Sequence, residues 1–380
     1  MRIPYATQWI DAADVKEVIE ALYSSHLTQG PRIAAFEKKV AEYCGARYAV
    51  AVNSGTAALH AACFAVGLKP GDEVITSPIT FVASANCVLY CGGRPVFADV
   101  QSDTINISPE DVNNKISNKT KAVIPVHFAG QPCDLEELSN IAQKNGLVVI
   151  EDAAHALGAE YKGSKVGACK YSDMTILSFH AVKHITTGEG GMILTNREDI
   201  YNQLMMFRTH GITRDGDLMI NKHEGLWFYE MQLLGFNYRI TDFQCALGMK
   251  QMDKLEEFVS RRRKIVAKYD QAFRKIANIV LLKEKAENKS SWHIYPIQVK
   301  SDRHKVFDAL QREGIGVNVH YIPVYLQPYY SELGYQPGIC PRSEKYYSQA
   351  ITLPLYPKMK DEDVDTIIEK VSAALEDCSI

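Results

Sequence analysis

YSDMTILSFHAVKHITTGEGGMIL (171–194) predicts two adjoining strands with a reactive lysine in the loop between them. The pattern indicates an apolar strand over 174–179, a polar turn with Lys183, a loop rich in threonine and glycine, and a second strand over 192–194. The neighbours of Lys183 are small, hydroxylated or apolar, and Glu189 is the one nearby opposite charge. A lysine in such surroundings loses its proton readily, as a Schiff-base nucleophile must. A solvated surface lysine is the alternative.

Composition excludes several classes of protein. The chain has 380 residues, of which 46% are hydrophobic and 23% charged, as in soluble two-domain proteins. The net charge of -3 gives no reason to expect nucleic acid as a partner. Nine cysteines without CxxC pairs predict reduced thiols and a cytoplasmic protein. Because the sequence has no cluster of cysteines and histidines, a metal site is not expected. We see no signal peptide and no membrane-spanning run.

Strands and helices alternate along the first 250 residues. Expected strands cover 48–52, 73–78, 94–100, 121–128 and 147–152, and expected helices cover 11–23, 32–44, 56–67, 81–90, a segment from 109, and 135–145. Alternation of this kind predicts an α/β fold with a largely parallel sheet covered on both faces. The strands beside Lys183 would complete that sheet.

A smaller α+β unit follows. A long charged helix over about 252–276 contains the triplet Arg261, Arg262 and Arg263, which we expect to form a solvated helix face. Further elements are expected as strands over 292–299 and 316–321, and as helices over 305–313 and after 361. We therefore predict a large domain over 12–250 and a small domain over 251–380.

Candidate ligand groups follow the strands of the expected sheet, where open parallel sheets bind ligands. Gly55 and Thr56 open a helix whose free amides favour a phosphate dianion, although an ordinary helix cap has the same pattern. Asp152 ends a buried strand, where a carboxylate either pairs with a cation, such as a protonated pyridine nitrogen, or caps the next helix. His155 lies against such a ring or is a core histidine.

Two further residues complete this set. Phe81 follows the strand EVIT, and an aromatic side chain there stacks on a flat cofactor or belongs to the core. Ser178 ends the strand before Lys183. A phosphate site, a partner for a ring nitrogen, a stacking aromatic and a lysine together match the protein's side of pyridoxal phosphate chemistry.

Motifs in one order run nearly from end to end. They are LTQGP (27–31), NSGTAALHAA (53–62), VFADV (96–100), EDAAHALGA (151–159), SFHAVKHITTGEGG (178–191), FRTHGI (207–212) and NYRITDFQCALGMKQM (237–252). With these motifs the chain resembles the DegT/DnrJ/EryC1/StrS family of sugar-nucleotide aminotransferases, which have the fold-type I architecture of pyridoxal-phosphate enzymes. His184 is a departure from that pattern, since related sequences often carry proline there.

The resemblance implies pyridoxal 5′-phosphate as the cofactor and Lys183 as the catalytic residue, bonded to it as an internal aldimine. Asp152 would pair with the pyridinium nitrogen, and Phe81 would stack on the ring, with His155 beside it. The remaining cofactor contacts implied by the resemblance, through the phosphate, are Gly55, Thr56, Ser178 and Asn237. Asn237 would reach the cofactor of the partner subunit, because the family forms homodimers with shared sites.

The resemblance also implies a nucleotide-sugar pocket. Its residues would be Tyr5 in the N-terminal segment, Ser25, His26, Leu27, Thr28, Asn318, Val319, His320 and Tyr321. The stretches 77–86, 127–134, 319–330 and 352–357 resemble the family members that use L-glutamate to aminate C4 of UDP-4-keto-6-deoxy-L-AltNAc, a step toward pseudaminic acid.

Other readings of the sequence stay open. One is another nucleotide-sugar aminotransferase, either of the 4-amino-4-deoxy-L-arabinose type or acting at C3. A dehydratase branch replaces the lysine with histidine, so Lys183 favours transamination. A regulatory or binding protein without catalysis is the alternative from a different class. The segment 207–227 is expected to be a mobile loop near the site, with no role assigned.

Overall fold

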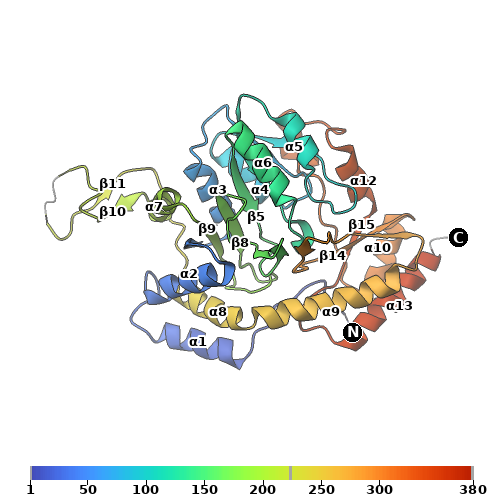
Figure 1. Ribbon diagram of the computed structural model, residues 1–380. Coiled ribbons are helices and arrows are strands. Elements are labelled where there is room, and N and C mark those ends of the chain that lie inside the picture. Colours follow the sequence, from blue (N-terminus) through green and yellow to red (C-terminus); the bar gives the residue numbers. More distant parts are fainter. Residues whose placement is uncertain (1, 222–224, 378–380) are drawn as a thin grey trace.

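The computed structural model describes residues 2–221 and 225–377 (Figure 1). Its centre is a seven-stranded sheet with the strand order β1-β9-β8-β5-β4-β2-β3. These strands are β1 (Tyr48–Val52), β9 (Gly191–Thr195), β8 (Met174–Ser178), β5 (Val148–Asp152), β4 (Thr120–Ile124), β2 (Glu73–Thr76) and β3 (Arg94–Phe97). The expected sheet is confirmed, and the two strands predicted in the stretch 171–194 are β8 and β9, which pair with each other.

The sheet is parallel except at one strand. β5 pairs in parallel with β8 and β4, and β2 pairs in parallel with β4 and β3. β9 runs antiparallel to both β8 and β1. A parallel neighbour needs a crossover of about a dozen or more residues, usually a helix. The loop 179–190 contains no helix, so the chain returns beside β8 in the opposite direction and leaves Lys183 at the carboxyl end of β8.

Helices cover both faces of this sheet, as predicted. The first face packs against α3 (Gly55–Ala65), α4 (Ala83–Tyr90) and α7 (Glu198–Phe207). The second face packs against α2 (Pro31–Cys44), α5 (Pro109–Lys115), α6 (Leu135–Asn145), α8 (Asp242–Asp253) and α9 (Leu255–Phe273). The alternation is visible in β1, where Val50 contributes to the first core and Ala51 to the second. The α1 helix (Ala12–Leu22) packs outside α8 (Figure 1).

A second, antiparallel sheet is built from the end of the chain. It has the order β12 (Ile279–Leu281), β14 (Tyr295–Val299) and β15 (Ala350–Leu353). Its core includes side chains from α9, α10 (Arg303–Arg312) and α13 (Asp361–Asp377). The short elements that remain are β6 (Glu160–Tyr161), β7 (Ser164–Lys165), β13 (Asn288–Lys289), α11 (Pro328–Glu332), α12 (Pro341–Gln349) and two 3-10 turns, Phe128–Gly130 and Val324–Leu326.

The long helix expected over about 252–276 is confirmed as α9, which follows α8 directly after Lys254. One expectation about this second half was wrong. The segment 316–321 is not a strand, because its pairing is limited to one bridge between Asn318 and Thr352. Side chains of this segment line a cavity instead of packing in a sheet. The domain division near residue 250 stays a prediction.

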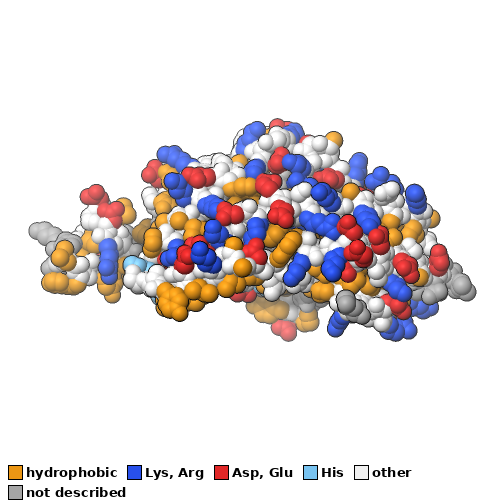
Figure 2. All heavy atoms as spheres, turned by 90° about the horizontal axis from the view of Figure 1, so that it is seen from below, with side chains coloured by type: hydrophobic (Ala, Val, Ile, Leu, Met, Phe, Trp, Pro, Cys, Tyr) orange, Lys and Arg blue, Asp and Glu red, His pale blue; other side chains and the backbone are white. Residues whose placement is uncertain are grey.

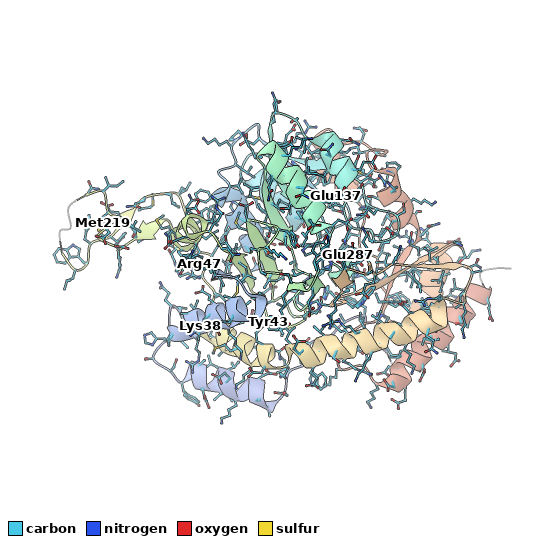
Figure 3. All side chains as sticks on the ribbon, viewed as in Figure 1. Lys38, Tyr43, Arg47, Glu137, Met219 and Glu287 are labelled. Atoms are coloured by element: carbon cyan, nitrogen blue, oxygen red, sulfur yellow. The ribbon has the colours of Figure 1, made fainter. Side chains whose placement is uncertain are left out.

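A hairpin after α7 projects from the body of the molecule (Figure 1). We call residues 212–221 and 225–234 the arm; it contains β10 (Ile212–Thr213) and β11 (Glu230–Met231), and Figure 3 shows Met219 on it, away from the body. Ile220, Leu226 and Trp227 are 83%, 96% and 73% exposed. Figure 2 shows hydrophobic side chains gathered on the face below, where α1 exposes Val15 and Ile19.

Two general observations concern the described residues. Their cysteines form no disulfide, and all but Cys91 are buried. None of their helices combines the length and the hydropathy that crossing a membrane would require.

Candidate active site

A cavity of about 700 Å³ opens at the carboxyl ends of β5 and β8. This is the edge at which open parallel sheets bind ligands. Most of the predicted site residues line it: Tyr5, Gly55, Thr56, Phe81, Asp152, His155, Ser178, Lys183, Asn318, Val319, His320 and Tyr321. Residues separated by more than 300 positions in the sequence therefore meet around one space.

The first end of the cavity is the start of α3. Ser54 has an extended backbone and its hydroxyl accepts a hydrogen bond from the amide of Ala57 at 3.1 Å. The first amides of a helix have no acceptor within it, so those of Gly55 and Thr56 are free for an anion. A Cβ on Gly55 would lie 3.1 Å from Cβ of Ser178 and 3.3 Å from its Oγ. Glycine therefore keeps open a cradle between α3 and β8 that suits a phosphate group.

Asp152 lies at the other end of the cavity, at the close of β5. It is 5% exposed, and its carboxylate accepts hydrogen bonds from Ser84 Oγ at 2.6 Å and from the amide of Ala154 at 3.1 Å. No helix follows Asp152, so the alternative reading as a helix cap was wrong. No cation of the described residues forms an ion pair with this carboxylate. A buried carboxylate of this kind favours a cationic partner such as a pyridinium nitrogen.

Two rings line the cavity between these ends. Phe81 is 60% exposed on the cavity wall, which is a large exposure for a phenylalanine and leaves its ring free to stack. His155 is buried, and its Nε2 lies 3.2 Å from the hydroxyl of Tyr321. Its Nδ1 is buried without a hydrogen-bond partner among the described residues. Burial first, and then the charge of Lys183, hold the pKa of His155 well below its usual value, so the ring is neutral.

Lys183 lies in a turn with a fixed backbone. Its amide donates to the carbonyl of His180 at 2.9 Å, and the amide of Thr187 donates to the carbonyl of Phe179 at 3.0 Å. Burial lowers the pKa of Lys183 to about 8, with Arg262 also lowering it and Asp152 opposing. A substantial fraction of the amine is therefore neutral near pH 8, and only the neutral amine attacks an aldehyde.

The set fits pyridoxal phosphate. A glycine cradle with free amides, an unpaired buried carboxylate, a free aromatic face and an amine of lowered pKa surround one cavity. Gly55, Thr56 and Ser178 would hold the phosphate, Asp152 the ring nitrogen and Phe81 the ring face. Each of these assignments stays a prediction.

Five predicted residues lie outside this cavity. Ser25, His26, Leu27 and Thr28 follow α1, where Thr28 forms a backbone bridge with Thr241. Asn237 is exposed, and its backbone pairs with Thr209. The expected loop 207–227 also fails to line the cavity of its own subunit, and residues 222–224 lie outside the described residues.

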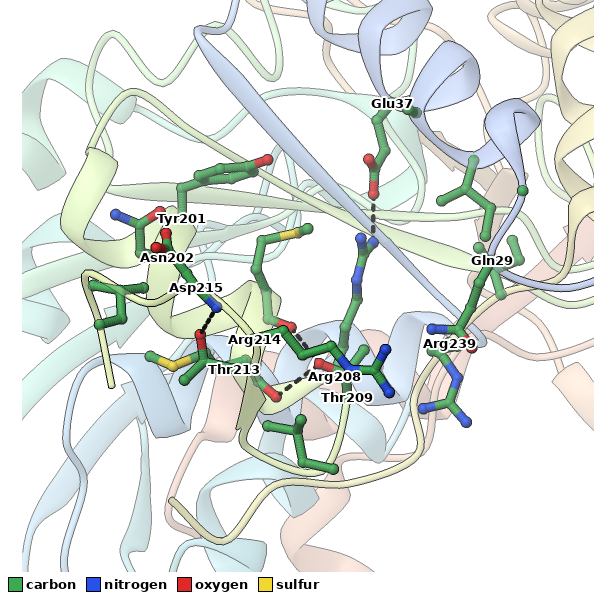
Figure 4. Close-up of a pocket in the computed structure, with 18 residues that line it drawn as sticks. Gln29, Glu37, Tyr201, Asn202, Arg208, Thr209, Thr213, Arg214, Asp215 and Arg239 are labelled. Atoms are coloured by element: carbon green, nitrogen blue, oxygen red, sulfur yellow. Dashed lines mark hydrogen bonds and ion pairs between the residues drawn. The ribbon is translucent and has the colours of Figure 1, made fainter. Parts of the chain in front are cut away.

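A second cavity, of about 590 Å³, lies beside the segment that contains Asn237 (Figure 4). It lies between α2, α7 and the arm. Arg208 pairs with Glu37 across it and donates to the carbonyl of Ala51 at 2.8 Å. The backbone carbonyl of Arg208 accepts from the amide of Tyr238 at 3.0 Å, so the ion pair fixes the segment next to Asn237. Arg214 and Arg239 also line this cavity.

Several residues of the cavity are not predicted by any pattern in the sequence. Ser84 touches Asp152, and its only linear signal is its place one helical turn after Thr80, whose Oγ lies 2.7 Å from Ser84 Oγ. His180, His293 and Gln327 also line the cavity. The sequence pattern predicts a strand over 292–299 that includes His293, but β14 begins two residues after His293.

The fold and the site together define a class of protein. A mostly parallel sheet with a lysine loop, an aspartate and a phosphate cradle at its carboxyl edge is the arrangement of fold-type I enzymes dependent on pyridoxal phosphate. A sequence profile described as the DegT/DnrJ/EryC1/StrS aminotransferase family matches residues 8–372. The chain belongs to this family, and it is a sugar aminotransferase that uses pyridoxal phosphate.

Individual relatives are similar over their whole length. The chain is 40% identical over 376 residues to the spore coat polysaccharide biosynthesis protein SpsC of Bacillus subtilis, covering 97% of this chain and 96% of that one. It is 35% identical to the UDP-4-amino-4,6-dideoxy-N-acetyl-beta-L-altrosamine transaminase of Campylobacter jejuni, covering 98% of each chain. The solved structure of Spr1654 from Streptococcus pneumoniae in its PMP form, described as a sugar aminotransferase, is 33% identical with a TM-score of 0.93, covering 99% of this chain and 100% of that one.

Proposed function

We propose that the protein transfers the amino group of L-glutamate to C4 of UDP-2-acetamido-2,6-dideoxy-β-L-arabino-hex-4-ulose. The products are UDP-4-amino-4,6-dideoxy-β-L-AltNAc and 2-oxoglutarate. The observation that carries the transamination is the meeting of Lys183, Asp152 and the start of α3 in one cavity. Likeness to the Campylobacter jejuni transaminase over 98% of its length supports the choice of sugar.

Pyridoxal phosphate bound here supplies an electron sink that stabilises negative charge at the carbon that exchanges a proton. The neutral amine of Lys183 would take the proton from Cα of glutamate, and the resulting ammonium would pass it on. In the second half of the reaction the amine of Lys183 would again take up a proton, and its ammonium form would deliver that proton to C4 of the sugar. Asp152 would accept a hydrogen bond from the ring N–H, and Ser84 and the Ala154 amide orient its carboxylate for that role.

The sugar would enter from the side opposite the buried wall. Tyr5, Phe81, the segment 318–322 and Gln327 line the cavity, and the sugar nucleotide would contact these residues. The amide of Val319 already donates to Oδ1 of Asn318 at 2.8 Å, so it is not free to donate to the sugar. Side chains of this segment would therefore contact the sugar and the diphosphate.

The proposal includes a homodimer with shared sites. The arm and α1 each expose several large apolar side chains, and exposed apolar surface is characteristic of interaction sites. Asn237 and Ser25 to Thr28 lie outside the cavity of their own chain, and in the dimer they would complete the cavity of the partner. We place the enzyme in the cytoplasm, a location that unpaired buried cysteines support.

The visible absorbance of the bound cofactor tests the proposal. Glutamate should bleach the band, and adding the UDP-4-keto sugar afterwards should restore it, while Lys183→Ala shows no glutamate response. A band that glutamate bleaches and this sugar leaves bleached would contradict the substrate assignment and retain the aminotransferase. Keto sugars of the 4-amino-4-deoxy-L-arabinose type and 3-keto sugars would then be tried. No band in the presence of added pyridoxal phosphate would contradict the whole proposal.

A further inference from the structure

One arginine of α9 lies inside the apolar stripe of the helix. The buried apolar side chains of α9 recur at helical spacing and are Leu255, Phe258, Val259, Ile265, Val266, Tyr269 and Phe273. Arg262 falls on the same stripe and is 1% exposed. The expectation that Arg261 to Arg263 form a solvated face was therefore wrong for Arg262, and the stripe itself was the signal that could have corrected it.

The guanidinium of Arg262 binds backbone carbonyls only. Its Nη1 donates to the carbonyls of Leu355 and His293, each at 2.9 Å, and to that of Trp292 at 3.3 Å. Its Nε has no hydrogen-bond partner among the described residues. Its neighbour Arg261, in contrast, pairs with Asp361 at 2.7 Å.

A buried cation without a carboxylate is costly to the fold. Burial alone accounts for the lowering of the pKa of Arg262 to about 9, with no acidic group opposing it. Transfer of a charge to the interior without a partner costs several kcal/mol, roughly, after relaxation. We therefore asked what else the contacts of Arg262 do, starting from where the three carbonyls lie.

Two of those carbonyls belong to Trp292 and His293, next to the wall of the cofactor cavity. His293 lines the cavity, and the centres of the His293 and His155 rings are 4.4 Å apart. The backbone just before His293 is strained, because Trp292 has φ of 49°, a left-handed conformation that a large side chain rarely adopts. The amide of His293 is held by the carbonyl of Ala129 at 2.8 Å, and Arg262 holds the carbonyl side.

We propose that Arg262 is a positioning residue of the cofactor site, which clamps the strained segment 292–293 and keeps the His293 ring against His155. This inference rests on the proposed role of Lys183. A second consequence is electrostatic. Asp152 and Arg262 are the charged groups that act on Lys183, with opposite signs, while the buried histidines His155, His293 and His320 have lowered pKa values and add no charge near pH 7.

Three variants separate the clamp from the charge. Arg262→Met removes both. Arg262→Lys keeps the charge, but its amine ends one bond short of the position of Nη1 and so cannot reach all three carbonyls. Arg261→Met is the matched control because its partners lie at Asp361 and Met359. The first readout uses the cofactor-free protein: the rate at which it captures pyridoxal phosphate, followed against pH. Capture requires neutral Lys183, so the rate rises with pH through the pKa of that amine.

We expect Arg262→Met to move the midpoint of this pH profile upward by about 0.5 to 1 unit, because loss of a nearby cation stabilises the ammonium form. Arg262→Lys and Arg261→Met should keep the wild-type midpoint. The second readout is steady-state kinetics, in which Arg262→Lys should lose about tenfold in kcat with little change in KM, because displaced rings misplace the reacting groups.

Contrary results are equally clear. An unmoved midpoint in folded Arg262→Met, or wild-type kcat in folded Arg262→Lys, would overturn the inference. Melting temperatures of the cofactor-free variants establish folding, and if Arg262→Met does not fold, the kcat of Arg262→Lys decides. If the wild-type protein captures pyridoxal phosphate at a residue other than Lys183, as shown by borohydride reduction and peptide mapping, the proposed function fails instead.

Discussion

The cofactor cavity and the arm are opposite kinds of region in one chain. Around the cavity, the reacting groups are held in place: Asp152 accepts from two donors, and the loop of Lys183 is fixed by its own backbone. On the arm, Trp227 and Leu226 are mostly exposed, and no core cluster of the described residues includes them. The cavity has the groups for the reaction, whereas the arm and its neighbour Asn237 have surfaces that need another molecule. The proposed site shared between two subunits would account for both.

Loss of Lys183 should have the largest effect. In Lys183→Ala and Lys183→Arg we expect turnover to fall by more than about 10³-fold, because no other amine can form the bond to the cofactor or carry the proton. The measurement is 2-oxoglutarate release, with the exposed Lys170→Ala as the control. Substantial turnover in folded Lys183→Ala would remove the residue from the mechanism.

Asp152→Asn is expected to come next. It keeps the shape of the side chain but removes the negative charge opposite the ring nitrogen, so kcat should fall about 10²- to 10³-fold. Asp173→Asn is the control, since Asp173 pairs with Arg197 outside the cavity. An Asp152→Asn enzyme with wild-type kcat would show that the carboxylate has only a structural role.

Polar substitution on the arm tests the other side of the comparison. Trp227→Ser with Ile220→Ser should weaken self-association by about 10²-fold, because large aromatic side chains dominate interface energetics. Activity should become dependent on protein concentration over the same range. Sedimentation velocity measures the first effect, with exposed Leu333→Ser as the control for loss of a surface apolar group. Unchanged association would mean that the arm has another partner.

Acid sensitivity should be the smallest of these effects. Burial lowers the pKa values of His155, His184 and His293 well below normal, so these rings are neutral in the folded protein. In the unfolded chain a histidine gains a proton below about pH 6.5, so stability is complete above that pH and is lost as the pH falls toward the folded-state values.

Substitution of one ring measures this contribution. His184→Asn should make the dependence of the unfolding free energy on pH shallower by about 1.4 kcal/mol per pH unit between pH 6 and 5. Urea unfolding at several pH values gives this slope, with exposed His304→Asn as the control. An identical slope in wild type and His184→Asn would contradict the assignment of a neutral buried ring.

The sequence pattern predicted the central sheet and the residues at the ends of its strands. The strands around the sheet, and Gly55, Asp152 and Lys183 at their ends, follow from alternation and from the rule that ligands bind at the carboxyl edge. The class of the enzyme followed from motif order. The same reasoning could not find Ser84 or His293, because their roles depend on which residues meet them in space.

The misses have a common physical cause. The segment 316–321 has the apolar letters of a strand, but its neighbours leave it facing a cavity. The charge of Arg262 predicts an exposed side chain, whereas its spacing on the apolar stripe of α9 indicates burial. Tertiary packing overrode the local preference at each of these places.

Subunit mixing tests the central claim most directly. Lys183→Ala and Asn237→Asp should each be inactive, the second because its carboxylate would face the phosphate of the partner's cofactor. When the two are dissociated together and reassociated, half of the dimers are mixed, and each mixed dimer has one site with both wild-type residues. The account predicts recovery of about a quarter of wild-type activity. Mixed dimers without activity would contradict a site shared between subunits.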